Sequence, residues 1–159
     1  MSEKFDVVII GAGPGGYVAA IKAGQAGLKV ACIDKAELGG ICLNWGCIPT
    51  KAFLKSAEVL QSMKHAEDFG LSCSNAKASL EAIVKRSRGV SSTMVNGIEF
   101  LFKKNKVTHI QGTAEIIASN LVQVTDEEGS RHIETDKVIV STGASPVKIP
   151  IFPVDGENI

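Results

Sequence analysis

The sequence has no net charge and few cysteines, and it contains no long apolar run. Its 17 basic and 17 acidic residues balance, and without a Lys/Arg cluster we expect no nucleic-acid partner. Four cysteines in 159 residues are too few for a disulfide-rich secreted scaffold. No apolar run reaches the roughly 20 residues that span a membrane, so we expect no membrane partner.

Metal-ligand and targeting patterns are also scarce. The histidines His65, His109 and His132 have no neighbours in the sequence that suggest catalysis or a metal site. Residues 1–6 carry acids and lead directly into a strand pattern, unlike a signal peptide or an Arg-rich transit peptide, so we expect a cytoplasmic protein. With 159 residues and 45% hydrophobic residues, the composition is that of one globular domain with a sizeable core.

The first 34 residues have the pattern of a β-α-β unit. Residues 5–10 are an almost continuous apolar run, typical of a strand that is buried on both faces. An alanine-rich helical pattern follows at 17–26, and a second apolar strand at 29–33 ends on Asp34. Two parallel strands joined by a helix are the first part of a doubly wound nucleotide-binding sheet.

A glycine-rich turn joins the first strand to its helix. Gly11, Gly13 and Gly16 fall in the three key positions of G-x-G-x-x-G. Gly11 would allow the tight turn, Gly13 the approach of a pyrophosphate, and Gly16 close packing of the helix on the strand. Asp34 follows Gly11 by 23 positions, where a carboxylate can bind ribose hydroxyls, although it could also be a solvated charge.

Two cysteines, Cys42 and Cys47, lie five positions apart. Pro49 suits the first turn of a helix, so Cys47 is expected near a helix N-terminus, which favours a thiolate. An ideal helix places Cα atoms five residues apart at roughly 8–9 Å. A disulfide needs less than about 7 Å, so a bridge requires a helix break, which Gly46 and Asn44 permit. Unrelated cysteines and, less favourably, a zinc site remain the alternatives.

The segment around these cysteines resembles the active-disulfide signature of the FAD-dependent pyridine-nucleotide disulfide oxidoreductases. The matching residues are Gly39, Gly40, Cys42, Asn44, Gly46, Cys47, Ile48, Pro49 and Lys51. Residues 42–49 are most similar to the branch that oxidises dihydrolipoamide. Trp45, which varies among relatives, could shield the disulfide or fill core, and we expect it to fill core.

The resemblance implies specific roles. Cys42 is the expected interchange thiol, and Cys47 passes electrons to the flavin. Lys51 would lie against the flavin and stabilise negative charge on its reduced ring. The first dinucleotide unit of the family binds the adenosine half of FAD, and NAD uses a later one. Asp34 stands where the family more often has Glu, and we interpret this departure as minor.

Two later segments match FAD-contacting positions of the family. Ala114 follows Gly112 and Thr113 at the place where backbone meets the adenine. Thr142 and Gly143 match a turn of small residues that follows an apolar strand and, in the family, approaches the FAD. The alternative is that this segment is only a loop at the end of a strand, without a role in binding.

The whole pattern predicts an α/β fold, namely part of a Rossmann-like, three-layer FAD-binding domain with an antiparallel β-meander insertion. Helices are expected at 51–69 and 80–102. The meander is expected to contain the strands 107–111, 114–118, 121–125 and 131–134, before a third parallel strand that starts at 137. Residues 1–148 would be the first part of the FAD-binding domain, and 149–159 a linker towards a missing NAD-binding domain.

The resemblance covers the first third of a family member, so we expect an N-terminal portion that is inactive alone. The intact enzyme would oxidise dihydrolipoamide, carried on a lipoyl domain of a 2-oxo-acid dehydrogenase complex, with NAD as acceptor, and would be a homodimer. A sister enzyme of the glutathione or mercuric reductase type is the first alternative. A non-catalytic nucleotide-binding module is the second.

Overall fold

The computed structural model describes residues 3–145, 147, 149, 151 and 155–157. The predicted linker at 149–159 therefore lies largely outside the described residues, and the proposed boundary at 148 stays a prediction. No helix in the described part of the chain is long and apolar enough to cross a membrane.

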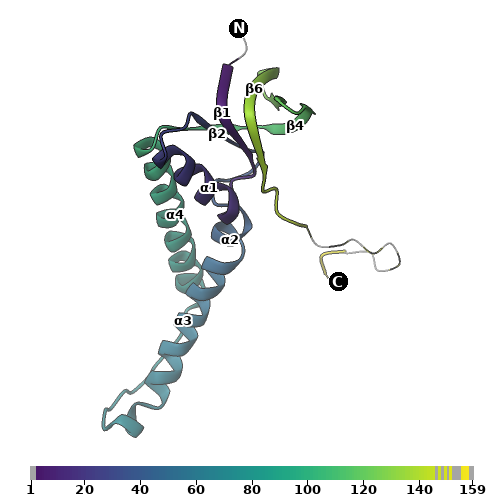
Figure 1. Ribbon diagram of the computed structural model, residues 1–159. Helices are drawn as coiled ribbons and strands as arrows, with labels where there is room; N and C mark the ends of the chain where they lie inside the picture. Colours follow the sequence, from purple (N-terminus) through teal and green to yellow (C-terminus); the bar gives the residue numbers. More distant parts are fainter. Residues whose placement is uncertain (1–2, 146, 148, 150, 152–154, 158–159) are drawn as a thin grey trace.

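A six-stranded sheet forms the centre of the molecule (Figure 1), with the spatial order β3-β2-β1-β6-β5-β4. Its strands β1, β2, β3 and β6 pair in parallel, whereas β4 and β5 continue the sheet from β6 in antiparallel pairing. Their bounds are β1 (Glu3–Ile10), β2 (Val30–Asp34), β3 (Val107–Gln111), β4 (Thr113–Ala118), β5 (Leu121–Asp126) and β6 (Gly129–Val140).

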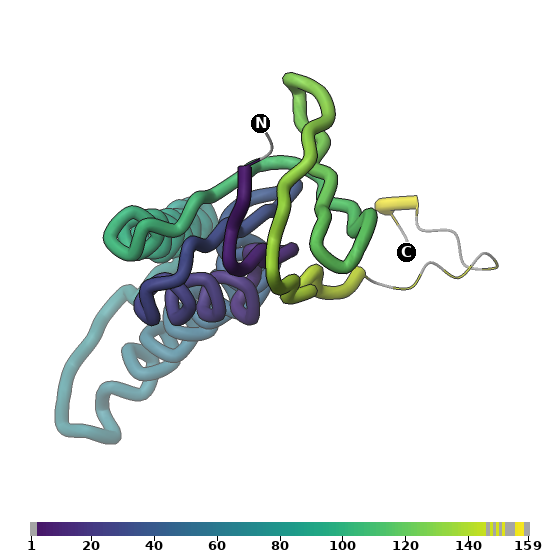
Figure 2. Tube along the Cα trace, turned by 45° about the horizontal axis from the view of Figure 1, so that its top comes forward, coloured from purple at the N-terminus to yellow at the C-terminus, as the bar shows by residue number. Residues whose placement is uncertain are grey.

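The helices lie in the two crossover connections of the parallel strands. Helix α1 (Pro14–Gln25) joins β1 to β2, and the second crossover contains α2 (Gly40–Asn44), α3 (Cys47–Lys64), the short 3-10 helix η1 (Ala66–Phe69) and α4 (Leu80–Lys104). Figures 1 and 2 show α3 and α4 side by side, extending far beyond the sheet. The C-terminal half of α4 returns to pack beside α1.

The core consists of two apolar clusters on opposite faces of the sheet, because successive strand residues point to opposite sides. Val7 and Ile9 of β1 pack in one cluster with residues of α1 and α4, including Ile21 and Phe102. Val8 and Ile10 pack in the other cluster with side chains of β5 and β6, namely Val122, Val124 and Ile133. Helices thus cover one face and the meander covers the other, which confirms the predicted α/β, Rossmann-like fold class.

The strand prediction is wrong at one end of the meander. Residues 107–111 were expected in the antiparallel part, but β3 pairs in parallel with β2, with Val30 beside Val107 and Ile33 beside Ile110. Val107 and Ile110 are buried in opposite clusters, as in a strand with two covered faces. The five residues of β3, of which only Val107 and Ile110 are apolar, carry no information on the partner strand, so the direction of pairing could not be predicted.

The predicted break between 134 and 137 is also wrong, because β6 runs without interruption over 12 residues. Its first half pairs with β5, and its pairing with β1 extends from Ile133 to Val140. The polar Thr135 is accommodated inside the strand: its N–H donates to Asn120 O at 2.9 Å and its hydroxyl to Lys137 O at 2.8 Å.

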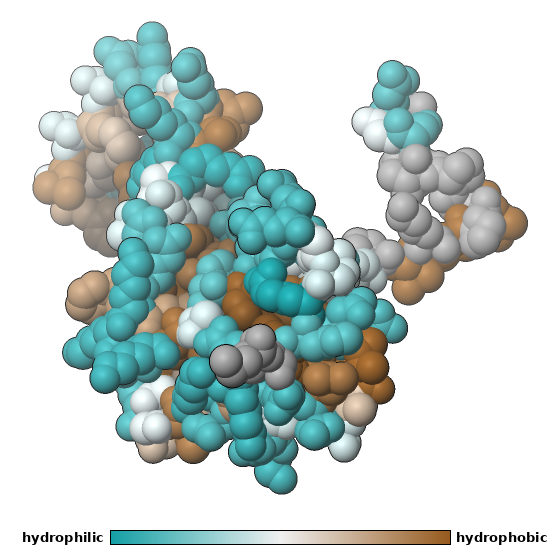
Figure 3. All heavy atoms as spheres, turned by 90° about the horizontal axis from the view of Figure 1, so that it is seen from above, coloured by the Kyte–Doolittle hydropathy of each residue, from teal (hydrophilic) through white to brown (hydrophobic). Residues whose placement is uncertain are grey.

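Apolar side chains remain exposed on the helical hairpin and on β6. Figure 3 shows brown hydrophobic patches that interrupt a largely hydrophilic face. Leu54 on α3, Phe69 on η1 and Leu80 on α4 are all more than 60% exposed, as is Val140 at the end of β6. Exposed apolar side chains in this number are typical of surfaces that pack against further protein.

Candidate active site

A disulfide joins Cys42 in α2 to Cys47, the first residue of α3. The Cα atoms of the pair are 4.6 Å apart, about half of the separation in an unbroken helix. The break lies at Trp45 and Gly46, whose N–H groups both donate to Ile41 O, at 2.9 and 2.7 Å. The expected departure from helix geometry is therefore present. No group of potential metal ligands occurs among the described residues, and the cysteines pair with each other.

Cys47 lies at the positive end of a long helix. Helix α3 has 18 residues, its N-terminus has no side-chain cap, and the first turn contains Pro49. The partial positive charge of such a terminus stabilises a thiolate on Cys47. Cys47 is exposed and Cys42 half-buried, and Lys51 follows Cys47 by one turn with its side chain in solvent. Trp45, which we expected to fill core, is 53% exposed, because no layer of the described chain covers the outer side of this turn.

The helix that carries Cys42 begins on the glycine-rich turn. Gly39 N–H donates to Ala12 O at 2.9 Å, and a Cβ on Gly40 would lie 2.8 Å from the Cα of Gly13. The side-chain amide of Asn44 donates to Leu38 O and to the carbonyl of Gly40, at 3.1 and 3.0 Å. These contacts fix the disulfide-bearing segment directly beside the nucleotide-binding turn.

The three motif glycines have the surroundings that their predicted roles require. Gly11 has φ +102° and its Cα abuts Ser141, since an added Cβ would lie 2.2 Å from Ser141 O. A Cβ on Gly16 would lie 1.7 Å from Gly11 O, so only glycine lets α1 approach β1 this closely. Around Gly13, in contrast, nothing lies within 4 Å of an added Cβ. This open space at the N-terminus of α1 fits a pyrophosphate group.

Asp34 binds the glycine-rich turn itself. Its Oδ2 accepts from Ala12 N–H at 2.6 Å, and its Oδ1 accepts from Ala36 N–H at 2.9 Å. A carboxylate has about four acceptor positions, so two bonds leave capacity for ribose hydroxyls. The structure thus gives Asp34 a structural role that the sequence did not indicate, and its binding of ribose hydroxyls stays a prediction.

A buried thiol lies under the same turn. Cys32 is fully buried on β2, and its Sγ lies 3.9 Å from Gly11 O, towards which the thiol donates. Burial, together with the nearby Asp34 carboxylate, raises the pKa of Cys32 to about 12. Cys32 is consequently an inert core thiol and not a third redox group.

The remaining predicted cofactor residues lie at the same edge of the sheet. Ser141 N–H donates to Ile10 O at 2.7 Å, which places the exposed Thr142 and Gly143 next to the glycine-rich turn. Gly112 N–H donates to Asp34 O at 2.9 Å, and this bond brings the start of β4, with the half-buried Ala114, to the end of β2. The carboxyl ends of parallel strands are where ligands bind in such sheets.

Sequence reasoning missed the donors that α4 contributes to this site. Arg88 donates to Asn44 O at 2.8 Å, across 44 positions of the sequence. Arg86 donates to Ala52 O at 3.0 Å and Ser87 to Pro49 O at 3.4 Å. The only signal was that the buried Ser87 interrupts the apolar stripe of its helix.

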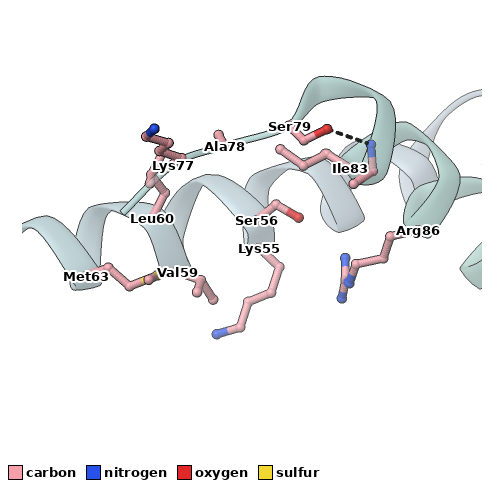
Figure 4. A pocket seen from close by; sticks show the side chains of 11 residues that line it. Lys55, Ser56, Val59, Leu60, Met63, Lys77, Ala78, Ser79, Ile83 and Arg86 are labelled. Carbon is pink, nitrogen blue, oxygen red and sulfur yellow. Dashed lines mark hydrogen bonds between the residues drawn. The ribbon is translucent and has the colours of Figure 1, made fainter. Parts of the chain in front are cut away.

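A groove between α3 and α4 is separate from the disulfide. It has a volume of about 460 Å³ and begins on α3 at Lys55, two turns after Cys47. Its lining includes Ser56, Val59, Leu60 and Met63 of α3 and Ile83 and Arg86 of α4 (Figure 4). The Ser79 hydroxyl, also in the lining, caps α4 by accepting from Ala82 N–H.

Fold and site together define a dinucleotide-binding protein that carries a disulfide beside its phosphate-binding turn. Comparison with known families gives the same result: residues 5–158 match the model described as "Pyridine nucleotide-disulphide oxidoreductase". The chain belongs to this family. The family assignment confirms FAD as the predicted cofactor.

Curated relatives and solved structures agree with the family assignment. The chain is 49% identical to "Dihydrolipoyl dehydrogenase" of Chlorobaculum parvum over 99% of its length, and 44% identical to the protein of that name from Zymomonas mobilis over 100%. In each case it covers 34% of the relative. The copper(II) complex of the HOCl-induced flavoprotein disulfide reductase RclA from Escherichia coli superposes with a TM-score of 0.74 and 27% identity, over 93% of this chain and 30% of that one. The chain thus spans about a third of the length of the proteins it matches.

Proposed function

We propose that this chain supplies the FAD-binding turn and the reacting disulfide of an enzyme that oxidises dihydrolipoamide with NAD as acceptor. The observation that carries the proposal is the attachment of the Cys42–Cys47 segment to the glycine-rich turn through Gly39 and Gly40. This attachment holds a reducible disulfide beside the nucleotide site. The names of the curated relatives support dihydrolipoamide as the substrate.

The residues present fit FAD. The open space at Gly13 and the N-terminus of α1 would take the pyrophosphate, and the free acceptor capacity of Asp34 the ribose. Ala114, Thr142 and Gly143 would line the cofactor, and Lys51 would place a cation near its ring system. FAD, when bound, provides a two-electron acceptor that can in turn reduce NAD.

The disulfide performs the exchange with the substrate. A thiolate of dihydrolipoamide attacks Cys42 Sγ, the Cys42–Cys47 bond breaks, and Cys47 leaves as a thiolate that the N-terminus of α3 stabilises. The second substrate thiol, deprotonated by a base from outside this chain, displaces Cys42 and closes the lipoamide disulfide. Two electrons have then passed from the substrate to the protein dithiol, and Lys51 and the helix terminus favour the anionic form that reacts onward.

The wider assignments are part of the same proposal. The substrate would be presented by a lipoyl domain of a 2-oxo-acid dehydrogenase complex, and the full-length enzyme would be a cytoplasmic homodimer. Residues 1–148 would belong to the FAD-binding domain and 149–159 to a linker. These assignments depend on the relatives rather than on contacts within the chain.

A chimeric enzyme tests the proposal. Residues 1–159 replace the matching third of the Chlorobaculum parvum relative, and reduction of NAD by dihydrolipoamide is measured at 340 nm. We expect turnover in the chimera and its loss in Cys42→Ser and in Cys47→Ser, with Cys73→Ser as the matched control at an exposed free cysteine. Turnover that survives either replacement would contradict the proposed role of the disulfide.

The same chimera separates the alternatives. Activity with glutathione disulfide or mercuric ion and a reduced nicotinamide, in the absence of dihydrolipoamide turnover, would favour a sister reductase. Bound flavin without any of these activities would favour a non-catalytic module. The similarity to a flavoprotein disulfide reductase is the observation that keeps the first alternative open.

A further inference from the structure

Three consecutive side chains of α4 donate to main-chain carbonyl groups of the segment that carries the disulfide. Arg88 donates to Asn44 O, the last carbonyl of α2, at 2.8 Å. Ser87 and Arg86 donate to Pro49 O and Ala52 O in the first turns of α3. All three acceptors lie within five positions of Cys47.

The geometry of the disulfide explains why such bonds matter. To bring the cysteines within bonding distance, the chain breaks between α2 and α3, and the carbonyls at the end of α2 lose the N–H partners that a continuing helix would supply. Helix α2 has five residues, too few to persist without outside support. Arg88 replaces one of the missing donors and ties the end of α2 to the 25-residue helix α4.

We propose that Arg88 is a positioning residue for the reacting disulfide, assisted by Arg86 and Ser87. It fixes the Asn44 carbonyl, and its guanidinium adds positive charge to the turn in which Cys47 becomes a thiolate. A cation near a leaving thiolate lowers its pKa and speeds thiol–disulfide exchange. This inference rests on the proposed function, because it assumes that Cys42–Cys47 is the bond that reacts.

The test is reduction of the disulfide in the purified protein by dithiothreitol. A dithiothreitol thiolate attacks the Cys42–Cys47 bond, and its second thiol releases the mixed disulfide, so two electrons pass to the protein and dithiothreitol is cyclised. For Arg88→Gln we expect the rate and the equilibrium constant of reduction to fall roughly threefold or more, the size of a charge effect at a partly exposed helix terminus.

A matched control comes from the same helix. Lys85→Gln removes one positive charge from α4, but among the described residues the Lys85 side chain has no hydrogen bond or ion pair and is exposed. We expect its exchange rate to equal that of the unmodified protein. Arg88→Lys, which keeps the charge and one donor, should recover most of the lost rate, a rescue that a purely structural role would not predict.

The outcomes are distinct. Equal rates in Arg88→Gln and Lys85→Gln, or equal slowing in Arg88→Lys and Arg88→Gln, would overturn the inference, and urea unfolding curves show whether each variant is folded. Arg86→Gln provides a second variant with the same expected direction. Because dithiothreitol replaces the substrate, a shifted exchange rate alongside absent dihydrolipoamide turnover would reject the proposed function alone. Normal turnover with an unchanged exchange rate would reject only this inference.

Discussion

At the scale of single residues, the motif glycines serve different purposes: one allows close packing in the folded chain, and another leaves space for a ligand. Gly16 packs against the end of β1 and the turn that follows it, since an added Cβ would lie 3.4 Å from Ile9 Cγ2 and 1.7 Å from Gly11 O, whereas Gly13 faces open space. Both positions belong to the same sequence pattern. The close packing predicted for Gly16 is present, and the pyrophosphate-binding role of Gly13 stays a prediction. Only the structure shows what surrounds each glycine. The two surroundings predict different effects of an alanine substitution on stability.

We expect Gly16→Ala to destabilise the protein by roughly 3 kcal/mol, because the methyl group forces α1 away from β1. Gly13→Ala is the matched control. The φ of Gly13 is −69°, which suits alanine, so the free energy of unfolding should change by no more than about 0.5 kcal/mol. Urea unfolding measures both. In the chimera, Gly13→Ala should nevertheless weaken FAD binding roughly tenfold. Equal stability of the two variants would show that the close helix–strand contact does not limit folding.

Cys32 links the stability of the core to pH. Its pKa is about 12 in the folded protein against an ordinary 9.0, so the folded state holds the thiol proton more tightly than the unfolded chain. This contribution to stability is complete below about pH 9 and is lost as pH rises towards 12. Cys32→Ala should be less stable at pH 8 but lose less stability between pH 9 and 11, as measured by urea unfolding.

The exposed Cys73 provides the control for this prediction. Cys73→Ala should keep the pH dependence of the unmodified protein, since the other groups that titrate at high pH are unchanged. Iodoacetamide should label Cys73 in the folded protein and leave Cys32 unmodified. Parallel pH profiles in all three proteins would show that the burial of Cys32 does not contribute.

At the scale of elements, local patterns predicted the units that are local. The β1-α1-β2 unit follows from an apolar run, a glycine motif and a terminal acid within 34 residues, and all three elements are present. The helix break before Cys47 follows from the reach of a disulfide. The pairing of β3 with β2 and the bond from Arg88 to Asn44 join residues far apart in the sequence, and no periodicity encodes such partners.

Asn44 stabilises the short helix α2, because its side-chain amide donates hydrogen bonds to the carbonyls of Leu38 and Gly40. Asn44→Ala removes both bonds, and we expect the free energy of unfolding to fall by about 1–2 kcal/mol under oxidising conditions. Asn96→Ala on α4 is the control, because Asn96 is exposed and makes no side-chain hydrogen bond within the described residues; its effect should stay within about 0.5 kcal/mol. Similar urea midpoints for the two variants would contradict the role of Asn44 in stabilising α2.

At the scale of the whole molecule, the described residues form one side of the site and leave the other side exposed to solvent. The ends of β1, β2 and β6 supply the turn, the acid and the loop, while Cys47, Lys51, Thr142 and Gly143 remain exposed. The apolar side chains exposed on α3, η1, α4 and β6 indicate further surfaces that pack against additional protein. A chain that spans a third of its relatives would present such surfaces where the other two thirds meet it.

Because these site residues are exposed, we expect weak cofactor binding by the 159-residue chain. A well-formed site buries some 70–90% of a ligand the size of a drug, and FAD is larger, whereas the residues that fit FAD in this chain are largely exposed or face open space. After incubation with excess FAD and gel filtration, we expect a flavin-to-protein ratio well below one from the absorbance near 450 nm. The chimera should retain about one flavin per chain, because it has the full length of the relative, of which residues 1–159 match only 34%. A stoichiometric yellow complex of the chain alone would mean that the turn, Asp34 and the disulfide segment already provide most of the binding energy.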